Sequence, residues 1–156
     1  MARFKARDII ILWFPLFLFG CSGMKPTDLG CIAGKLAPCP NSPNCVSSQS
    51  QDRSRHVDPL AYRGSFSEAR QRLLSVLRNE TRIEVLETGD RYLHVTFTSA
   101  LFRFVDDVEF CFDTDANLIH VRSASRTGYF DFGVNRKRIE RIRNAFSEGE
   151  RTTDGY

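Results

Sequence analysis

The sequence predicts an α+β fold: a two-layer sandwich in which a four-stranded antiparallel sheet carries two helices on one face. Four short segments alternate apolar and polar residues, as strands with one buried face do. Apolar residues at helical spacing precede and follow these segments. The chain has 156 residues, 42% of them hydrophobic and 26% charged, which is the composition of one folded domain.

The first helix is predicted to start after Ser65. The run Ser65-Phe66-Ser67-Glu68 has the form of a capping box, in which the serine hydroxyl and the glutamate carboxylate each accept a hydrogen bond from the other residue's amide. Apolar residues then recur on one helical face for about fourteen residues. These residues are Ala69, Leu73, Val76 and Leu77.

Two hairpins are predicted between the helices, one over residues 83–98 and one over 107–122. In the second hairpin, pairing Phe112 with Ile119 places the apolar side chains on the face that the helices cover. The same register sets Glu109 opposite Arg122 on the other face, which we expect to be exposed. The last helix is predicted over 135–146, with one apolar stripe. Its residues are Ile139, Ile142 and Phe146.

The N-terminus is typical of an exported lipoprotein. A cationic start is followed by an apolar run over 9–19, too short to span a bilayer core, which needs about 20 residues. The run ends in Leu18-Phe19-Gly20-Cys21, which resembles the bacterial lipoprotein box, so we expect Cys21 to carry palmitate or similar acyl chains. An uncleaved anchor with a buried Cys21 is the alternative. Because Ser22 follows, we expect a lipid-anchored envelope protein of the outer membrane that faces the periplasm.

The domain boundaries follow from these patterns. We predict a signal peptide over 1–20, a tether and an irregular, disulfide-bearing arm rich in Cys and Pro over 21–60, the α+β domain over 61–147, and a disordered tail over 148–156.

Cys39 and Cys45 are predicted to form a disulfide. Export places them in an oxidising compartment, and the two prolines between them stiffen the loop that the bridge would close. A zinc site is the alternative, but the cysteine gaps of seven and five residues exceed the usual spacing. We expect Cys111 to stay reduced, although a bridge from Cys31 to Cys111 is the competing arrangement.

The net charge of the chain excludes a generally basic protein that binds nucleic acid. The formal net charge is +3, and the first eight residues account for most of it.

Segment 122–143 is different, because it holds seven basic residues against Asp131 and Glu140. It leads from the last strand into the last helix, where free amides favour anions. The candidate anion-binding residues are Ser123, Ser125, Arg126, Asn135 and Arg136.

The alternative for this segment is that its charges are satisfied internally. The pairs would be Arg126 with Asp131, Arg122 with Glu109, and Arg136 with Glu140. We expect Asp131 to bond to Arg126 or to the helix amides and so to close the site.

The sequence contains no established catalytic, metal-binding or cofactor-binding motif, and we predict no catalytic residue, metal or cofactor. Asp106 and Asp107 are consecutive, so on a strand they face opposite sides. Two functions therefore stay open. One is a non-catalytic binding or structural module that contacts an anionic lipid, murein or an acidic protein through segment 122–143. The other is a small periplasmic hydrolase or metal-dependent enzyme that uses His94, His120 and Cys111.

Three motifs in order resemble the bacterial and plastid family called domain of unknown function 1499. They are the phrase from Leu36 to Ser48, the phrase from Phe104 to Phe110, and the phrase from Arg122 to Arg126 continued by Asp131 to Arg136. The resemblance covers about Leu36 to Phe146. It implies a lipoprotein or membrane-anchored context, and it implies no activity.

Overall fold

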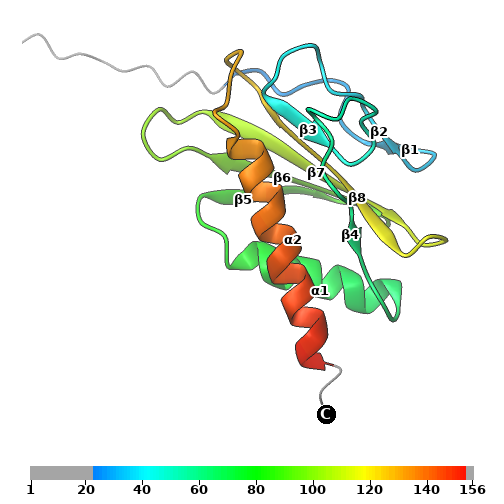
Figure 1. Ribbon diagram of the computed structural model, residues 1–156. Helices are drawn as coiled ribbons and strands as arrows, with labels where there is room; N and C mark the ends of the chain where they lie inside the picture. Colours follow the sequence, from blue (N-terminus) through cyan, green and yellow to red (C-terminus); the bar gives the residue numbers. More distant parts are fainter. Residues whose placement is uncertain (1–22, 154–156) are drawn as a thin grey trace, which may run out of the picture.

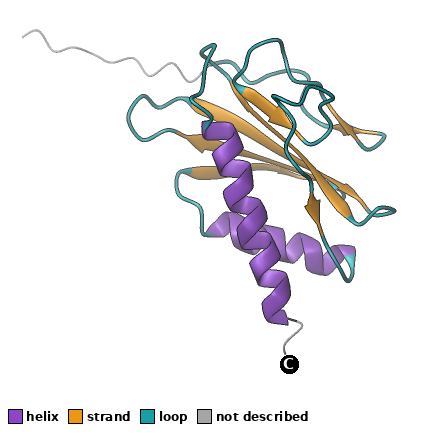
Figure 2. Ribbon diagram, viewed as in Figure 1, coloured by secondary structure: helices purple, strands orange, loops and turns teal. Residues whose placement is uncertain are grey.

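Two helices lie on one face of an antiparallel sheet, in a computed structural model that describes residues 23–153 (Figures 1 and 2). The helices are α1 (Phe66–Arg78) and α2 (Val134–Thr153). The sheet has the order β3-β8-β7-β6-β5, and β4 also pairs with β8. Its strands are β3 (Cys45–Ser47), β4 (Leu60–Ala61), β5 (Ile83–Thr88), β6 (Tyr92–Thr98), β7 (Val105–Asp113) and β8 (Leu118–Ser125). The predicted α+β class is confirmed.

The main core fills the space between the helices and the sheet. The apolar stripes predicted for both helices lie in this core with Val108, Phe110 and Val121, and all their residues are buried except Val76, which is partly buried and packs against it. The capping box is also present: the Ser65 hydroxyl accepts from the Glu68 amide, and the Ser65 amide donates to the Glu68 carboxylate.

The predicted register of the second hairpin is confirmed. Phe112 pairs with Ile119 and Phe110 with Val121, so all four face the helices. Alternation also places Asp106 and Asp107 on opposite faces of β7, because Asp106 meets helix α2 whereas Asp107 meets side chains of the other face.

The sheet has six strands where the sequence predicts four. The additional strands, β3 and β4, come from the segment predicted to be an irregular arm, and both pair with β8. Without them β8 would be an edge strand with a row of unpaired amides and carbonyls. Residues 45–61 are therefore part of the domain, and the predicted boundary at residue 61 is too late.

The rest of the arm covers the sheet face opposite the helices. Strands β1 (Cys31–Ile32) and β2 (Lys35–Leu36) form a small separate sheet, and Leu36 packs on Tyr92 and Cys111. Glu109 and Arg122, which were expected to be exposed, are consequently only 0% and 3% exposed.

Two further expectations are wrong. Cys111 is not reduced, because it forms a disulfide with Cys31, which joins the arm to the centre of the sheet. The predicted tail from residue 148 is helical as far as Thr153. Glu150 accepts hydrogen bonds from the Arg63 amide at 2.6 Å and from Arg72 of α1 at 3.1 Å, and these contacts hold the last turns of α2 against the domain.

The predicted signal peptide over 1–20 and the lipidation site at Cys21 lie outside the described residues. Within residues 23–153, no helix has the length and hydropathy to cross a bilayer.

Candidate functional site

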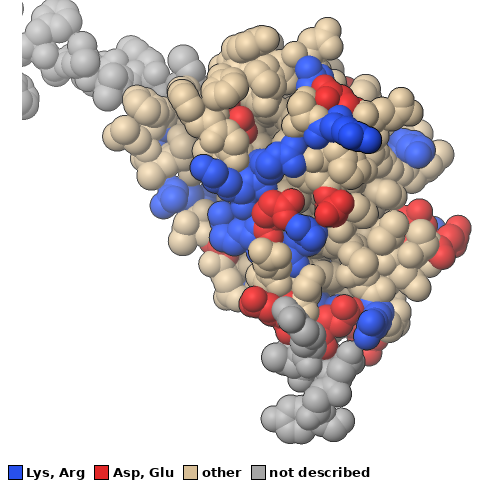
Figure 3. Space-filling view, in the orientation of Figure 1, with Lys and Arg blue, Asp and Glu red and all other residues tan. Residues whose placement is uncertain are grey.

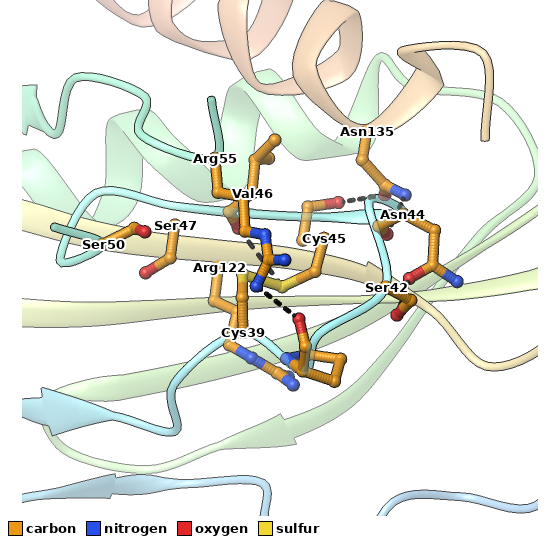
Figure 4. Close-up of a disulfide and its surroundings, with 12 residues drawn as sticks. Cys39, Ser42, Asn44, Cys45, Val46, Ser47, Ser50, Arg55, Arg122 and Asn135 are labelled. Carbon is orange, nitrogen blue, oxygen red and sulfur yellow. Dashed lines mark hydrogen bonds between the residues drawn. A yellow bond between two sulfur atoms is a disulfide. The ribbon is translucent and has the colours of Figure 1, made fainter. Parts of the chain in front are cut away.

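Asn135, in the first turn of α2, connects three parts of the fold. Its side-chain oxygen accepts hydrogen bonds from Ser123 at 2.5 Å and from Arg138 at 2.6 Å. Its side-chain nitrogen donates to the Asn44 carbonyl of the arm and to the Ser125 hydroxyl, both at 3.0 Å. Figure 4 shows Asn135 above the arm loop that carries Asn44. Asn135 is fully buried, so these bonds satisfy it and leave it closed to a ligand.

Arg126 lies on the arm-covered face and binds Asp107. Its guanidinium donates two hydrogen bonds of 2.8 Å to the two carboxylate oxygens. His94 Nε2 lies 2.8 Å from the same carboxylate. Burial by itself would raise the pKa of Asp107, but the hydrogen bonds from Arg126 and His94 outweigh it and hold that pKa below its usual value. Arg126 therefore pairs with Asp107 and not with Asp131.

Asp131 closes the N-terminus of α2. Its carboxylate accepts hydrogen bonds from the amides of Gly133 at 3.0 Å and Asn135 at 2.9 Å. These amides are the donors that an anion would use, so the closed arrangement with the helix amides is the observed one. Arg136, expected to pair with Glu140, instead donates to the backbone carbonyls of Ser54 and His56.

The five predicted anion-binding residues thus have internal partners. Ser123, Ser125 and Asn135 meet in one buried cluster, while Arg126 lies on the other face of the sheet and Arg136 reaches the arm. They do not form one vacant pocket.

Glu109 is the centre of a second buried polar cluster. It accepts hydrogen bonds from the Tyr92 hydroxyl and the Gly30 amide at 2.8 Å and from Arg122 at 2.9 Å. Burial and the adjacent Glu109 carboxylate raise the pKa of Tyr92. The Glu109 to Arg122 pair is as predicted, and the arm seals it from solvent.

The disulfide between Cys39 and Cys45 is present, in agreement with the prediction, and closes a tight loop at the start of β3. Arg55 extends over this loop and donates to the carbonyls of Pro40 at 2.7 Å and Asn41 at 3.0 Å (Figure 4). The disulfide therefore closes the loop, and Arg55 holds its N-terminal side.

A basic groove of about 310 Å³ lies between α2 and three neighbouring parts of the fold: the loop from α1 to β5, the end of β6 and the start of β7. In Figure 3 basic side chains gather over the first half of α2. The ionic residues of the groove, here called the α2 groove, are Arg82, Lys137, Arg138, Arg141, Glu80 and Asp106.

The charges of the α2 groove do not balance. Arg138 pairs with Asp106 at 2.6 Å and Arg141 with Glu80 at 2.7 Å. Arg82 and Lys137 are exposed, and neither forms an ion pair with any residue in the described range 23–153. Two positive charges in one recess are thus left for an external anion. Arginine offers a planar fork and lysine a compact charge, and both suit phosphate and carboxylate groups.

His94, His120 and Cys111 do not converge. His94 is on β6 and His120 on β8, and β7 lies between these strands. Cys111 is bonded to Cys31, so it offers no thiolate. Among residues 23–153 there is no group of three His, Cys, Asp or Glu side chains placed to hold a metal ion.

Arg82 and the Asp106 to Arg138 pair are residues of the candidate functional site that were not predicted from the sequence. A signal for the pair was present: Asp106 has the same parity as Val108 and Phe110, so it must face the helices and needs a cation from one of them. Arg138 also lies over the Phe97 ring, 4.6 Å from its centroid. For Arg82 there was no comparable pattern, because its place depends on the loop after α1.

Comparison with known proteins gives one family. Residues 35–146 match the family described as protein of unknown function DUF1499, and this match covers more than half of the chain. No curated protein matches the sequence. The resemblance expected from the three sequence motifs is confirmed, and the chain belongs to the DUF1499 family.

Proposed function

We propose that the protein is a lipoprotein of the cell envelope, anchored through acyl chains on Cys21 to the outer membrane and facing the periplasm. It acts there as a non-catalytic binding module whose anionic partner contacts segment 122–143 at the α2 groove. The partner offers phosphate or carboxylate groups, as anionic lipids, murein and acidic protein surfaces do. The observation that carries this proposal is the pair of unneutralised cations, Arg82 and Lys137, in one groove.

The other charges support this choice of site. Buried charges of the domain have partners, which is what stability requires of them. Arg82 and Lys137 lie at the surface, where a charge without a partner costs little and remains free to attract an anion. The groove replaces the five-residue pocket expected from the sequence, and it keeps the same segment and the same ligand chemistry.

In-envelope photo-crosslinking tests the proposal. A photoactivatable amino acid replaces Thr81, which lines the groove, or Ser67 on the first turn of α1 as a control position. We expect Thr81 to capture a phospholipid, murein or an acidic protein that Ser67 does not capture, and mass spectrometry of the adduct distinguishes these sources.

Charge reversal makes the test specific. The pair Arg82→Glu and Lys137→Glu should abolish the Thr81 adduct, and high salt should weaken it, because the attraction is screened. The matched pair Arg53→Glu and Arg91→Glu, at exposed positions outside the groove, should leave the adduct unchanged. Identical adducts at Thr81 and Ser67, or an adduct that survives reversal in the groove, would refute the proposal.

A further inference from the structure

Two loops at one end of the sheet expose large apolar side chains. The β6–β7 loop presents Leu101 at 78% and Phe102 at 63% exposure, and the β8–α2 loop presents Tyr129 at 73%, Phe130 at 60% and Phe132 at 81%. Strands β6 and β8 both run toward this end, and the Arg126 amide donates to the Val105 carbonyl at 3.0 Å where the loops meet. The aromatic tip consists of Leu101, Phe102, Phe104, Tyr129, Phe130 and Phe132.

The tip is built from ordered contacts within each loop. Phe102 stacks on Phe104 with ring centroids 5.6 Å apart, and Phe130 meets Phe132 edge to face at 5.2 Å. Phe132 has a φ of 55°, a left-handed conformation that is unfavourable for a bulky residue. The backbone is thus strained at Phe132, the residue with the most exposed aromatic ring of the tip. Exposed apolar groups gathered in this way mark a surface that binds a protein or a membrane.

The described chain begins beside the tip. A side chain at Gly23 would meet Arg126 and Thr127 at 2.8 Å, so the backbone at Gly23 packs on the base of the β8–α2 loop. In Figure 1 both tip loops and this start of the chain lie at the same end, whereas the β7–β8 turn lies at the other. Cys21 precedes Gly23 by two residues in the sequence, so acyl chains on Cys21 would tether the domain by this end.

The charges beside the tip are those that an anionic membrane attracts. Arg103 is exposed within the β6–β7 loop, and Arg82 and Lys137 lie at the same end of the sheet. The acid of the β8–α2 loop, Asp131, is engaged by two backbone amides. Basic residues next to aromatic and aliphatic ones are typical of segments that lie in the interface of a bilayer.

We infer that the aromatic tip is a membrane-docking surface, seated in the interface of the bilayer that holds the acyl chains of Cys21. This inference rests on the proposed lipidation of Cys21. It goes beyond the proposed function because it gives the domain an orientation relative to the bilayer. The strands extend away from the membrane surface, and the β7–β8 turn is the part farthest from it. A second copy of the chain or another protein on the tip is an alternative that the test must separate.

Fluorescence quenching tests this orientation. The single tryptophan of the sequence, Trp13, lies in the predicted signal peptide, so Phe132→Trp gives the mature protein one reporter at the tip. Ala116→Trp gives a matched reporter on the exposed β7–β8 turn. Each lipidated variant is placed in phosphatidylethanolamine and phosphatidylglycerol vesicles whose acyl chains carry bromine. The same anchor holds both variants to the same bilayer, so a difference in quenching reports orientation.

We expect the tip reporter to shift its emission to shorter wavelength and to lose most of its intensity, while the Ala116→Trp reporter changes little. Tyr129→Trp serves as a second tip reporter if Phe132→Trp does not fold. Equal quenching of tip and turn, or none at the tip, would overturn the inference. A blue shift without vesicles that grows with protein concentration would also overturn it, in favour of a second copy. Palmitate labelling is measured separately. If the protein is labelled but the tip is not quenched, the docking surface is wrong, whereas an unlabelled protein shows that the lipid anchor is wrong.

Discussion

Glu109 shows how a single residue depends on the arm. It is fully buried at the centre of the sheet and holds Tyr92, Arg122 and the Gly30 amide together. Alternation along β7 and β8 was enough to predict its face and its partner. Alternation was not enough to predict that Glu109 is buried, because the alternation of a strand does not show whether another segment covers its polar face.

This burial changes the expected effect of mutation. We expect Glu109→Ala to lower the free energy of unfolding by about 3 to 5 kcal/mol, because it removes the close, buried partner of Arg122 and leaves this buried charge only the exposed Asp28, 4.0 Å away. Phe110→Ala should cost a similar amount, about 3 to 5 kcal/mol, through the cavity left beneath the helices. Urea unfolding followed by circular dichroism measures both.

Two controls separate the causes. Glu87→Ala, at an exposed position on β5, should change the free energy of unfolding by less than about 0.5 kcal/mol. Replacing both partners, as Glu109→Met with Arg122→Met, should recover part of the loss, since no isolated charge remains. A Glu109→Ala protein as stable as the wild type would mean that the arm does not bury this pair.

At the level of elements, the arm is the part that sequence patterns describe least. The helices and the four longer strands, β5 to β8, have clear periodicity, so their order and the register of the second hairpin could be predicted. Strands β3 and β4 have three and two residues, too few for a period to be visible, and their partner β8 is far away in sequence. The predicted anion-binding residues do not form one pocket for a related reason. Arg126, which follows β8, pairs with Asp107 on the neighbouring strand β7, and spacing along the chain does not reveal this contact.

The two disulfides should contribute unequally to stability. The Cys31 to Cys111 bridge joins residues 80 apart in sequence, whereas Cys39 and Cys45 are 6 apart. By loop entropy, removing the long bridge with paired alanine substitutions should cost about 4 to 5 kcal/mol, against about 2 kcal/mol for the short one.

Urea unfolding of the two paired variants measures this difference. Unfolded, unreduced wild-type protein should in addition show no reactive thiol at any of these four cysteines. A free thiol at Cys111, or equal losses of stability from both pairs, would show that the long bridge does not hold the arm on the sheet.

At the scale of the whole molecule, one end of the domain collects the features that suit a membrane surface. The aromatic tip, the start of the described chain at Gly23 and the mouth of the α2 groove all lie near the N-terminal end of α2. The exposed aromatics lie in loops, which have no periodic pattern, so the sequence did not identify them as a group. Their gathering at one end follows only from the antiparallel order of β6, β7 and β8.

Metabolic labelling with a palmitate analogue tests whether Cys21 carries the lipid anchor, on which both the proposed function and the membrane-docking surface depend. We expect the wild-type protein to be labelled and to fractionate with the outer membrane. Cys21→Ala should lose the label, whereas the disulfide variant Cys39→Ala with Cys45→Ala should keep it. An unlabelled wild type, or equal label on Cys21→Ala, would contradict the account.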